Sequence, residues 1–239
     1  MTVNANSTVR DLATGVPGAT RVFESLGIDY CCGGGKPLTE ACSSAGVALD
    51  QVVLTLEQAA IEATQKGDDR DWSRESLTTL VSFIVDTHHA FDRQELDRIE
   101  PLLAKVVSVY REPHPYLIDI QRVFLALKAD LLNHMMKEEL VLFPYINALQ
   151  EATDRRASKP FPPFGTVRNP VRMMMVEHDA AGEMLRKIRE LSSDFTPPED
   201  ACVSYRALYE AFEGLERDLH RHIHLENNIL FPRAIEMEE

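Results

Sequence analysis

The sequence has few cysteines for its length and no long apolar run. Four cysteines among 239 residues do not make a disulfide framework. No apolar stretch approaches the roughly 20 residues that a membrane-spanning helix needs. The N-terminus lacks the basic start and apolar segment of a signal peptide. We therefore expect a cytoplasmic protein in a reducing compartment, with no membrane partner.

Basic residues are also scarce. The chain has 25 Lys and Arg against 38 Asp and Glu, a formal net charge of −13. Such an acidic surface repels nucleic acid and anionic lipid, so neither is an expected partner. No run of alternating polar and apolar residues indicates a β-sheet. The sequence therefore predicts an all-α fold.

The N-terminal part, residues 1–66, is predicted to form a small helical domain. One helix begins near Pro17 and ends before Gly27, and a longer one covers residues 49–65. The charged stretch 67–71 is the expected linker. These signals separate the N-terminal domain from the rest of the chain.

The second predicted domain, residues 73–239, contains four long helical patterns. They cover approximately residues 74–106, 115–150, 169–193 and 201–236. Proline-rich segments at 159–165 and 196–200 must be loops between them. Four helices joined in this way predict an antiparallel four-helix bundle.

Two segments of this domain share one pattern. Residues 130–144 and 218–232 both read Asp-Leu-x-x-His-x-x-x-Glu-x-x-(Val/Ile)-Leu-Phe-Pro. In each, the His and the Glu are four residues apart, so they lie one turn apart on the same helix face. The apolar positions indicate that this face turns inward, where the burial of His and Glu would be costly without compensation. A metal ion bound by both would provide it.

Two further histidines complete the pattern. His89 precedes His134 by 45 residues (134 − 89), and His178 precedes His222 by 44 (222 − 178). Each half of the bundle thus offers one His from one helix and His-x-x-x-Glu from the next. A single buried His is more often a hydrogen-bonded core residue, but two matched sets favour metal binding. The predicted ligands of two metal ions are His89, His134, Glu138, His178, His222 and Glu226.

The ligand types narrow the choice of metal. Imidazole and carboxylate without thiolate suit iron or manganese, and less often zinc. Two central glutamates can bridge a pair of ions. Asp130 and Asp218, one turn before His134 and His222, are candidates to accept the second imidazole N–H. His88, His220 and His224 are expected to face solvent, and the methionines at 173–175 to fill the core.

The segment Cys31-Cys32-Gly33-Gly34-Gly35 is the second unusual feature. Its glycines permit backbone shapes closed to other residues and let a partner approach closely. An exposed cysteine near backbone N–H groups can be reactive. The alternative is a glycine turn with incidental cysteines. Cys42 and Cys202 are interpreted as ordinary small apolar residues.

Asp29 through Gly34, together with the segments 134–139, 177–179 and 222–233, resembles the Repair of Iron Centres family. The resemblance implies a hemerythrin-like four-helix bundle with two non-haem iron ions per chain, oxo- or hydroxo-bridged. It selects His89 over His88. It also implies repair of iron–sulfur clusters damaged by nitric oxide or oxidants. Damaged iron–sulfur proteins would be the clients, with Cys31 and Cys32 as the thiols that receive iron or contact them.

The resemblance leaves several points open. Some family members have a further His where this chain has Tyr110, so that His114 or the phenol is a candidate replacement. Alternative functions are an oxygen or redox sensor, an oxygen carrier, or a di-iron nitric oxide reductase. Two Glu bridges and fewer histidines than oxygen-carrying hemerythrins disfavour oxygen carriage. Whether the protein is an enzyme, and whether it forms a homodimer, stay open.

Overall fold

The computed structural model describes residues 3–4, 6–66 and 71–239. Its regular elements over these residues are all helical, and an isolated antiparallel bridge joins Thr8 to Pro37. The predicted all-α fold, with a small helical N-terminal region followed by long packed helices, is confirmed.

The chain divides into two compact units. The first contains residues 1–80, 220–237 and 239, and the second contains residues 81–219 and 238. Residues 67–70 of the expected linker lie outside the described residues. The domain boundaries drawn from the sequence, 1–66 and 73–239, stay a prediction.

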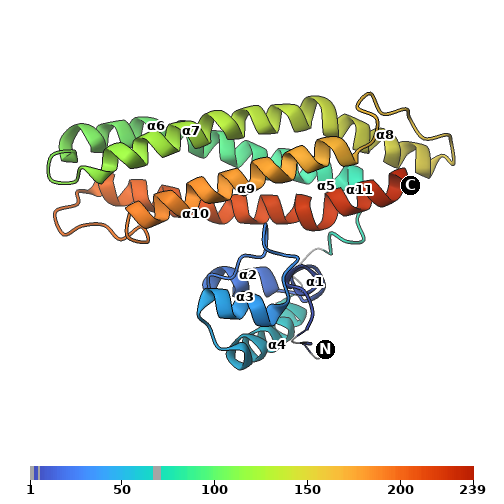
Figure 1. Cartoon of the computed structure of the whole chain (residues 1–239), viewed down its shortest axis with the longest axis horizontal. Helices are drawn as coiled ribbons and strands as arrows, with labels where there is room; N and C mark the ends of the chain where they lie inside the picture. Colours follow the sequence, from blue (N-terminus) through green and yellow to red (C-terminus); the bar gives the residue numbers. More distant parts are fainter. Residues whose placement is uncertain (1–2, 5, 67–70) are drawn as a thin grey trace. The chain divides into compact units, whose positions relative to one another are not determined.

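The first unit combines the N-terminal helices, of 7 to 18 residues, with residues 220–237 and 239 from the end of the chain. These helices are α1 (Val9–Gly15), α2 (Ala19–Ser25), α3 (Leu38–Ala45) and α4 (Leu49–Lys66) (Figure 1). Thr8 caps α1, because its hydroxyl accepts a hydrogen bond from the Asp11 N–H at 3.1 Å. Helix α3 was not predicted from the sequence; it begins after Pro37, and Gly46, with φ +68°, caps its C-terminal end. Phe23, Leu38 and Leu56 are fully buried in the core of these helices.

The second unit is built from long helices. They are α6 (Ala90–Tyr110), α7 (Tyr116–Lys137), α8 (Phe143–Asp154), α9 (Arg168–Leu191) and α10 (Val203–Leu225), the last of which ends in the first unit. Helix α7 packs against both α6 and α9 (Figure 1). The rings of Phe124 and Phe212 meet edge to face at 5.6 Å in the core.

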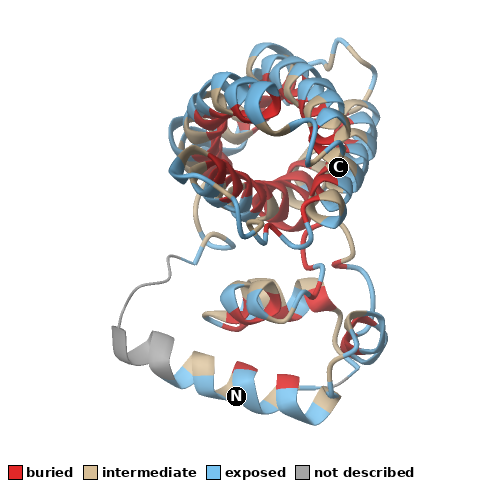
Figure 2. Cartoon of the chain, turned by 90° about the vertical axis from the view of Figure 1, so that its left-hand side faces the viewer, coloured by how far each residue is buried: buried red, intermediate tan, exposed pale blue. Residues whose placement is uncertain are grey.

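Buried residues lie on one side of each long helix, and exposed residues lie on the other. Figure 2 shows buried residues on the inner sides and exposed residues on the outer sides. On α9 the buried stripe contains Val171, Met174, His178, Ala181, Leu185 and Ile188. Met174 fills the core as expected, but the prediction was wrong for Met173 and Met175, which lie off this stripe and are exposed.

Glu238, near the end of the chain, forms hydrogen bonds at the start of α9. The Glu238 carboxylate accepts hydrogen bonds from the Val167 N–H at 2.9 Å and from the Tyr145 hydroxyl at 2.7 Å. Burial raises the pKa of Glu238, but hydrogen bonds from Thr166, Tyr145 and Val167 outweigh it and lower this pKa below its ordinary value. The carboxylate therefore stays charged where it satisfies backbone N–H groups at the beginning of the helix.

Three of the long helices contain a wide π-helical turn. These turns are η1 (Ile84–His89), between α5 (Leu77–Phe83) and α6; η2 (Glu138–Leu142), between α7 and α8; and η3 (Glu226–Leu230), between α10 and α11 (Phe231–Glu238). The Phe143 N–H bonds to the carbonyl of Glu138, and the Phe231 N–H to that of Glu226, five residues back in both cases. Pro144 and Pro232 follow directly and lack the N–H that a regular α-helix would use.

Within the part of the chain that the structure describes, no helix has the length and apolar character to cross a membrane.

Candidate metal centre

The six predicted metal ligands are all buried and lie at or near the π-helical turns. His89 is the last residue of η1, while Glu138 and Glu226 are the first residues of η2 and η3. His134 and His222 lie one turn earlier, near the ends of α7 and α10, and His178 lies in α9. No residue of the six is more than 2% exposed. π-Helical turns occur often at functional sites, because the wide turn redirects side chains.

The structure brings these six residues together in two groups. His89, Glu138, His222 and Glu226 form one group, and His134, Glu138, His178 and Glu226 form the other. Within each group one ligand atom from every residue lies within 4.8 Å of the others. Because both glutamates belong to both groups, the arrangement suits two metal ions bridged by carboxylates.

The hydrogen bonds around two of the histidines fix which ring nitrogen points inward. The Nδ1 of His89 lies 2.7 Å from Glu139 Oε1, and the Nδ1 of His134 lies 2.9 Å from Glu177 Oε2. A carboxylate only accepts hydrogen bonds, so each Nδ1 carries a proton and each ring turns its Nε2 inward.

The inward nitrogens face other acceptors. The Nε2 of His89 lies 3.4 Å from Glu138 Oε2, and the Nε2 of His134 lies 3.3 Å from the same oxygen. The Nε2 of His178 lies 3.0 Å from that of His134. Imidazole nitrogens and carboxylates that converge in a dry interior are costly to bury unless a positive charge compensates the carboxylates. The donor set therefore fits bound metal ions.

Glu139 and Glu177 are outer partners that the sequence analysis missed. Burial raises the pKa of Glu177, but hydrogen bonds from Lys137 and His134 lower it below its ordinary value. The pKa of Glu139 is lowered in the same way by His89 and Arg93. Both carboxylates therefore stay charged and hold their imidazoles in place. Their positions beside a ligand (Glu138-Glu139 and Glu177-His178) were the available signal.

The predicted outer partners, Asp130 and Asp218, differ in outcome. Asp130 is exposed, and the prediction was wrong for it, because the Nδ1 of His134 points across to α9 and not along its own helix. Asp218 lies 2.9 Å from His88 Nδ1, and its expected role at His222 stays a prediction. His88, expected in solvent, is only 5% exposed.

His224 is also buried, contrary to the prediction. It is 4% exposed, and its ring meets that of Tyr30 at 5.4 Å. Burial lowers the pKa of His224 to about 4, so the ring is neutral. Its Nδ1 accepts a hydrogen bond from the Asn228 amide at 2.9 Å. The third histidine expected in solvent, His220, is half-buried and bonds through Nδ1 to Glu24 at 3.1 Å.

Asn228 connects η3 to the cysteine loop, which we define as residues 29–35. Its Nδ2 also donates to the Tyr30 carbonyl at 2.9 Å, and its Oδ1 accepts from Arg10 Nε at 2.8 Å. A Cβ at Gly34 would lie 3.0 Å from the same Oδ1 and 3.1 Å from the Tyr30 carbonyl oxygen. Only glycine allows this close approach without a displacement.

The two cysteines of this loop are not bonded to each other. Their Sγ atoms are 3.7 Å apart, and Cys31 is buried while Cys32 is partly exposed. Asn227, the neighbour of Glu226, donates a hydrogen bond to the Cys31 carbonyl at 3.4 Å. The cysteine loop is therefore hydrogen-bonded to the two residues that follow a predicted metal ligand.

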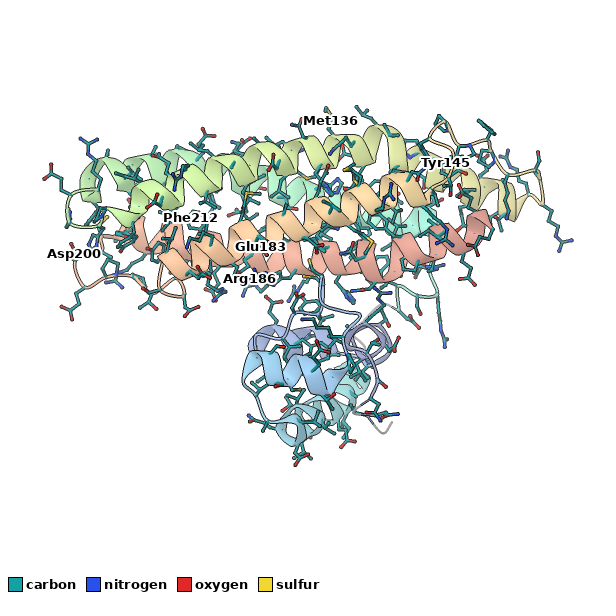
Figure 3. All side chains as sticks on the ribbon, viewed as in Figure 1. Met136, Tyr145, Glu183, Arg186, Asp200 and Phe212 are labelled. Carbon is teal, nitrogen blue, oxygen red and sulfur yellow. The ribbon has the colours of Figure 1, made fainter. Side chains whose placement is uncertain are left out.

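Tyr110 and His114 are not part of the candidate metal centre. The Tyr110 hydroxyl donates to the Asp200 carbonyl at 3.1 Å, and His114 Nε2 lies 3.0 Å from the Asp200 carboxylate. Figure 3 shows Asp200 at one end of the long helices, far from Met136, which is two residues after His134. Cys42 is buried as expected, whereas Cys202 is exposed beside Tyr110.

Comparisons with known proteins extend over nearly the whole chain. Residues 5–60 match the ScdA_N family model, described as "Domain of Unknown function (DUF542)". Residues 79–234 match the model described as "Hemerythrin HHE cation binding domain". Similar curated proteins include the "Iron-sulfur cluster repair protein YtfE" of Yersinia pseudotuberculosis serotype IB (strain PB1/+) and that of Yersinia pestis. Each is 35% identical over 233 residues, which are 98% of both chains. The chain therefore belongs to the Repair of Iron Centres family, which joins a small cysteine-containing N-terminal domain to a hemerythrin-like bundle.

Proposed function

We propose that this protein holds two non-haem iron ions and acts in the repair of iron–sulfur clusters damaged by nitrosative or oxidative stress. The observation that carries the proposal is the pair of buried His and Glu groups that share Glu138 and Glu226. The relatives matched along the whole chain are named iron–sulfur cluster repair proteins, which supports the same function.

The donor set favours iron. Four imidazoles and two carboxylates, without thiolate, suit ferrous and ferric ions. Two divalent ions bring four positive charges against the two charges of Glu138 and Glu226, so an oxo or hydroxo bridge would be accommodated. Six protein ligands over two ions also leave coordination positions open, and bound iron supplies exchangeable sites for small molecules there.

Neighbouring residues of the chain hold the predicted metal ligands in position. Glu139 and Glu177 hold the Nδ1 protons of His89 and His134, so that both rings turn Nε2 inward. Asn227 hydrogen-bonds the cysteine loop to η3. Cys31 and Cys32 are proposed as the thiols that receive iron or contact the client. The proposed clients are damaged iron–sulfur proteins in the cytoplasm, and nucleic acid is disfavoured by the net charge of −13.

The test uses the full-length protein, loaded with iron under anaerobic conditions. Metal analysis and Mössbauer spectroscopy should find two irons per chain, and His134→Ala and Glu226→Ala should each lose iron. The control is Glu183→Gln, at an exposed position on the outer side of α9. Loaded protein should also restore activity to an iron–sulfur enzyme damaged by nitric oxide. Full iron occupancy without any restored enzyme activity would refute the repair function. Steady consumption of nitric oxide would favour a nitric oxide reductase.

A further inference from the structure

A second apolar stripe runs along the outer face of α7 and into η2. It contains five large apolar residues that are 36% to 71% exposed, namely Ile118, Leu125, Leu132, Met136 and Leu140. Figure 3 shows Met136 on the outer side of α7. Other residues of the same helix, such as Phe124 and Leu131, pack into the core. A helix with apolar residues on two faces indicates a second packing partner.

We propose that this stripe, which we call the α7 seam, is the interface of a reversible homodimer. In this dimer two copies of α7 pack antiparallel about a two-fold axis at Ala129. The inference does not depend on the bound metal or on the proposed repair function.

The spacing of the seam is that of a coiled coil. Residues 118, 122, 125, 129, 132 and 136 are separated by alternating steps of four and three residues. All of them are apolar except Arg122. This spacing gives a narrow apolar strip that a second helix can cover, with the side chains of each helix inserted between those of the other.

The seam is complementary to itself when it is reversed. In an antiparallel pair centred on Ala129, each residue faces the one that lies equally far beyond the centre in the second copy. Ile118 would therefore face Leu140 of the second copy, and Leu125 would face Leu132. Arg122 would lay its aliphatic stem over Met136. The small side chain of Ala129 at the axis lets the two helices approach closely.

Charged residues beside the seam favour the same register. Asp119 and Lys137 are 18 residues apart (137 − 119), which is five turns, so they lie on the same side of α7 near opposite ends. Their side chains are 50% and 42% exposed. The two-fold axis brings Asp119 of each copy close to Lys137 of the other, so the dimer gains two pairs of opposite charge.

The charge of α7 differs from that of the whole chain. This helix has three basic and two acidic residues, whereas the chain has a formal net charge of −13. Two copies of so acidic a protein repel each other over most of their surface. They repel each other least where α7 faces α7, which supports a second copy as the partner of the seam.

The area of the seam predicts how strongly two copies associate. From Ile118 to Leu140 the seam is about 33 Å long. A helix with its side chains is about 12 Å wide, or about 15 Å with the radius of a water molecule added on each side. A partner that covers about one-third of this circumference would bury about 500 Å² per chain and about 1,000 Å² in the dimer. Stable complexes bury about 1,200 to 2,000 Å², so we expect a reversible dimer that forms at micromolar concentrations.

The first test is sedimentation velocity of the full-length protein at about 1 to 300 μM, with a reductant to prevent disulfides through the exposed Cys202. We expect the sedimentation coefficient to rise from that of a monomer to that of a dimer. Leu125→Asp should weaken association at least tenfold at unchanged helical circular dichroism. Val109→Asp is the matched control, because it introduces the same charge at an exposed apolar residue of α6 and should associate like the native protein.

The second test measures the register of the dimer by carbodiimide crosslinking and mass spectrometry. A carbodiimide joins a carboxylate to an amine that is in contact with it. Asp119 and Lys137 of one chain are about 27 Å apart along α7, so an amide bond between them can form only between two copies. We expect this crosslink in the native dimer and its loss in Asp119→Asn. The link between Lys137 and Glu177, which are paired within one chain, is the positive control.

Three results would overturn the inference. The protein could stay monomeric over the whole range of concentrations, which would show that the seam is not an interface between copies. Association that survives Leu125→Asp would place the interface on another surface. A dimer that gives the Lys137–Glu177 link without the Asp119–Lys137 link would contradict the antiparallel register about Ala129.

Discussion

Replacement of Glu177 by Gln tests whether the outer carboxylates hold the metal ligands. Glu177 lies 2.9 Å from His134 Nδ1 and is also paired with Lys137. Glutamine is nearly the same size, and its amide oxygen can still accept the Nδ1 proton. The substitution therefore removes mainly the negative charge that makes the imidazole a stronger donor.

The expected loss of metal affinity follows from the distance between the Glu177 carboxylate and a bound metal ion. A metal ion bound to the far nitrogen of His134 would lie about 7 Å from the Glu177 carboxylate. At an effective dielectric constant of roughly 40 to 80, attraction to a doubly charged ion at that distance is about 1.2 to 2.4 kcal/mol. Since about 1.4 kcal/mol corresponds to a tenfold change, Glu177→Gln should weaken metal binding roughly 10- to 50-fold.

The assay is competition for metal between the protein and a chromophoric chelator at fixed pH and ionic strength. Glu183→Gln is the matched control, because it removes the same charge from the same helix. Glu183 is exposed and pairs with Arg186 at 3.3 Å, and Figure 3 shows both on α9. If Glu177→Gln binds metal within threefold of Glu183→Gln, the outer carboxylate does not support the site and the reasoning is wrong.

Three further outcomes are expected. Gly34→Ala would press its Cβ against Asn228 and should lower the free energy of unfolding in urea by about 1–3 kcal/mol. Gly35→Ala is the control and should leave this free energy unchanged, because its Cβ meets nothing within 4 Å. Equal effects of the two substitutions would contradict the steric argument. The folded-state pKa of Glu238 is lowered, so its stabilisation is complete above the ordinary carboxyl pKa and is lost as the pH falls through the lower folded value. At pH 7, Glu238→Gln should cost about 1 kcal/mol after solvent screening, and a difference that persists in strong acid would argue against this assignment. Pro232→Ala restores an N–H that favours a regular α-helix over η3. Metal affinity should therefore fall severalfold, while the helical circular dichroism signal stays unchanged. An unchanged metal affinity would count against a role for this proline.

The sequence was most informative where two signals repeated. The shared pattern at 130–144 and 218–232, with His89 and His178 at matching intervals, was enough to predict which six side chains meet. Helical periodicity also predicted the extents of the long helices to within a few residues, because their buried stripes are continuous. Observed α9, for example, covers Arg168–Leu191 where 169–193 was expected.

The environment of the site could not be predicted in the same way. Periodicity says which face of a helix turns inward, but not which neighbouring helix faces a given atom. Asp130 therefore seemed the natural partner of His134, while the structure uses Glu177 from α9. His224 was misjudged for a similar reason, because the contact that buries it comes from Tyr30, almost 200 positions earlier in the chain. The wide turns also left no periodic trace in the sequence.

Each wide turn amounts to one extra residue lodged in an otherwise regular rod. Because η3 accommodates this extra residue locally, losing a residue from it would mainly displace the side chains of the turn itself, and Glu226 is the first of them. The same deletion would restore ordinary backbone hydrogen bonding and stiffen the helix. Such a deletion variant would be more stable to unfolding but would bind its metal ions more weakly. Homologues that differ by one residue at η3 are the place to look for this trade-off between stability and metal affinity.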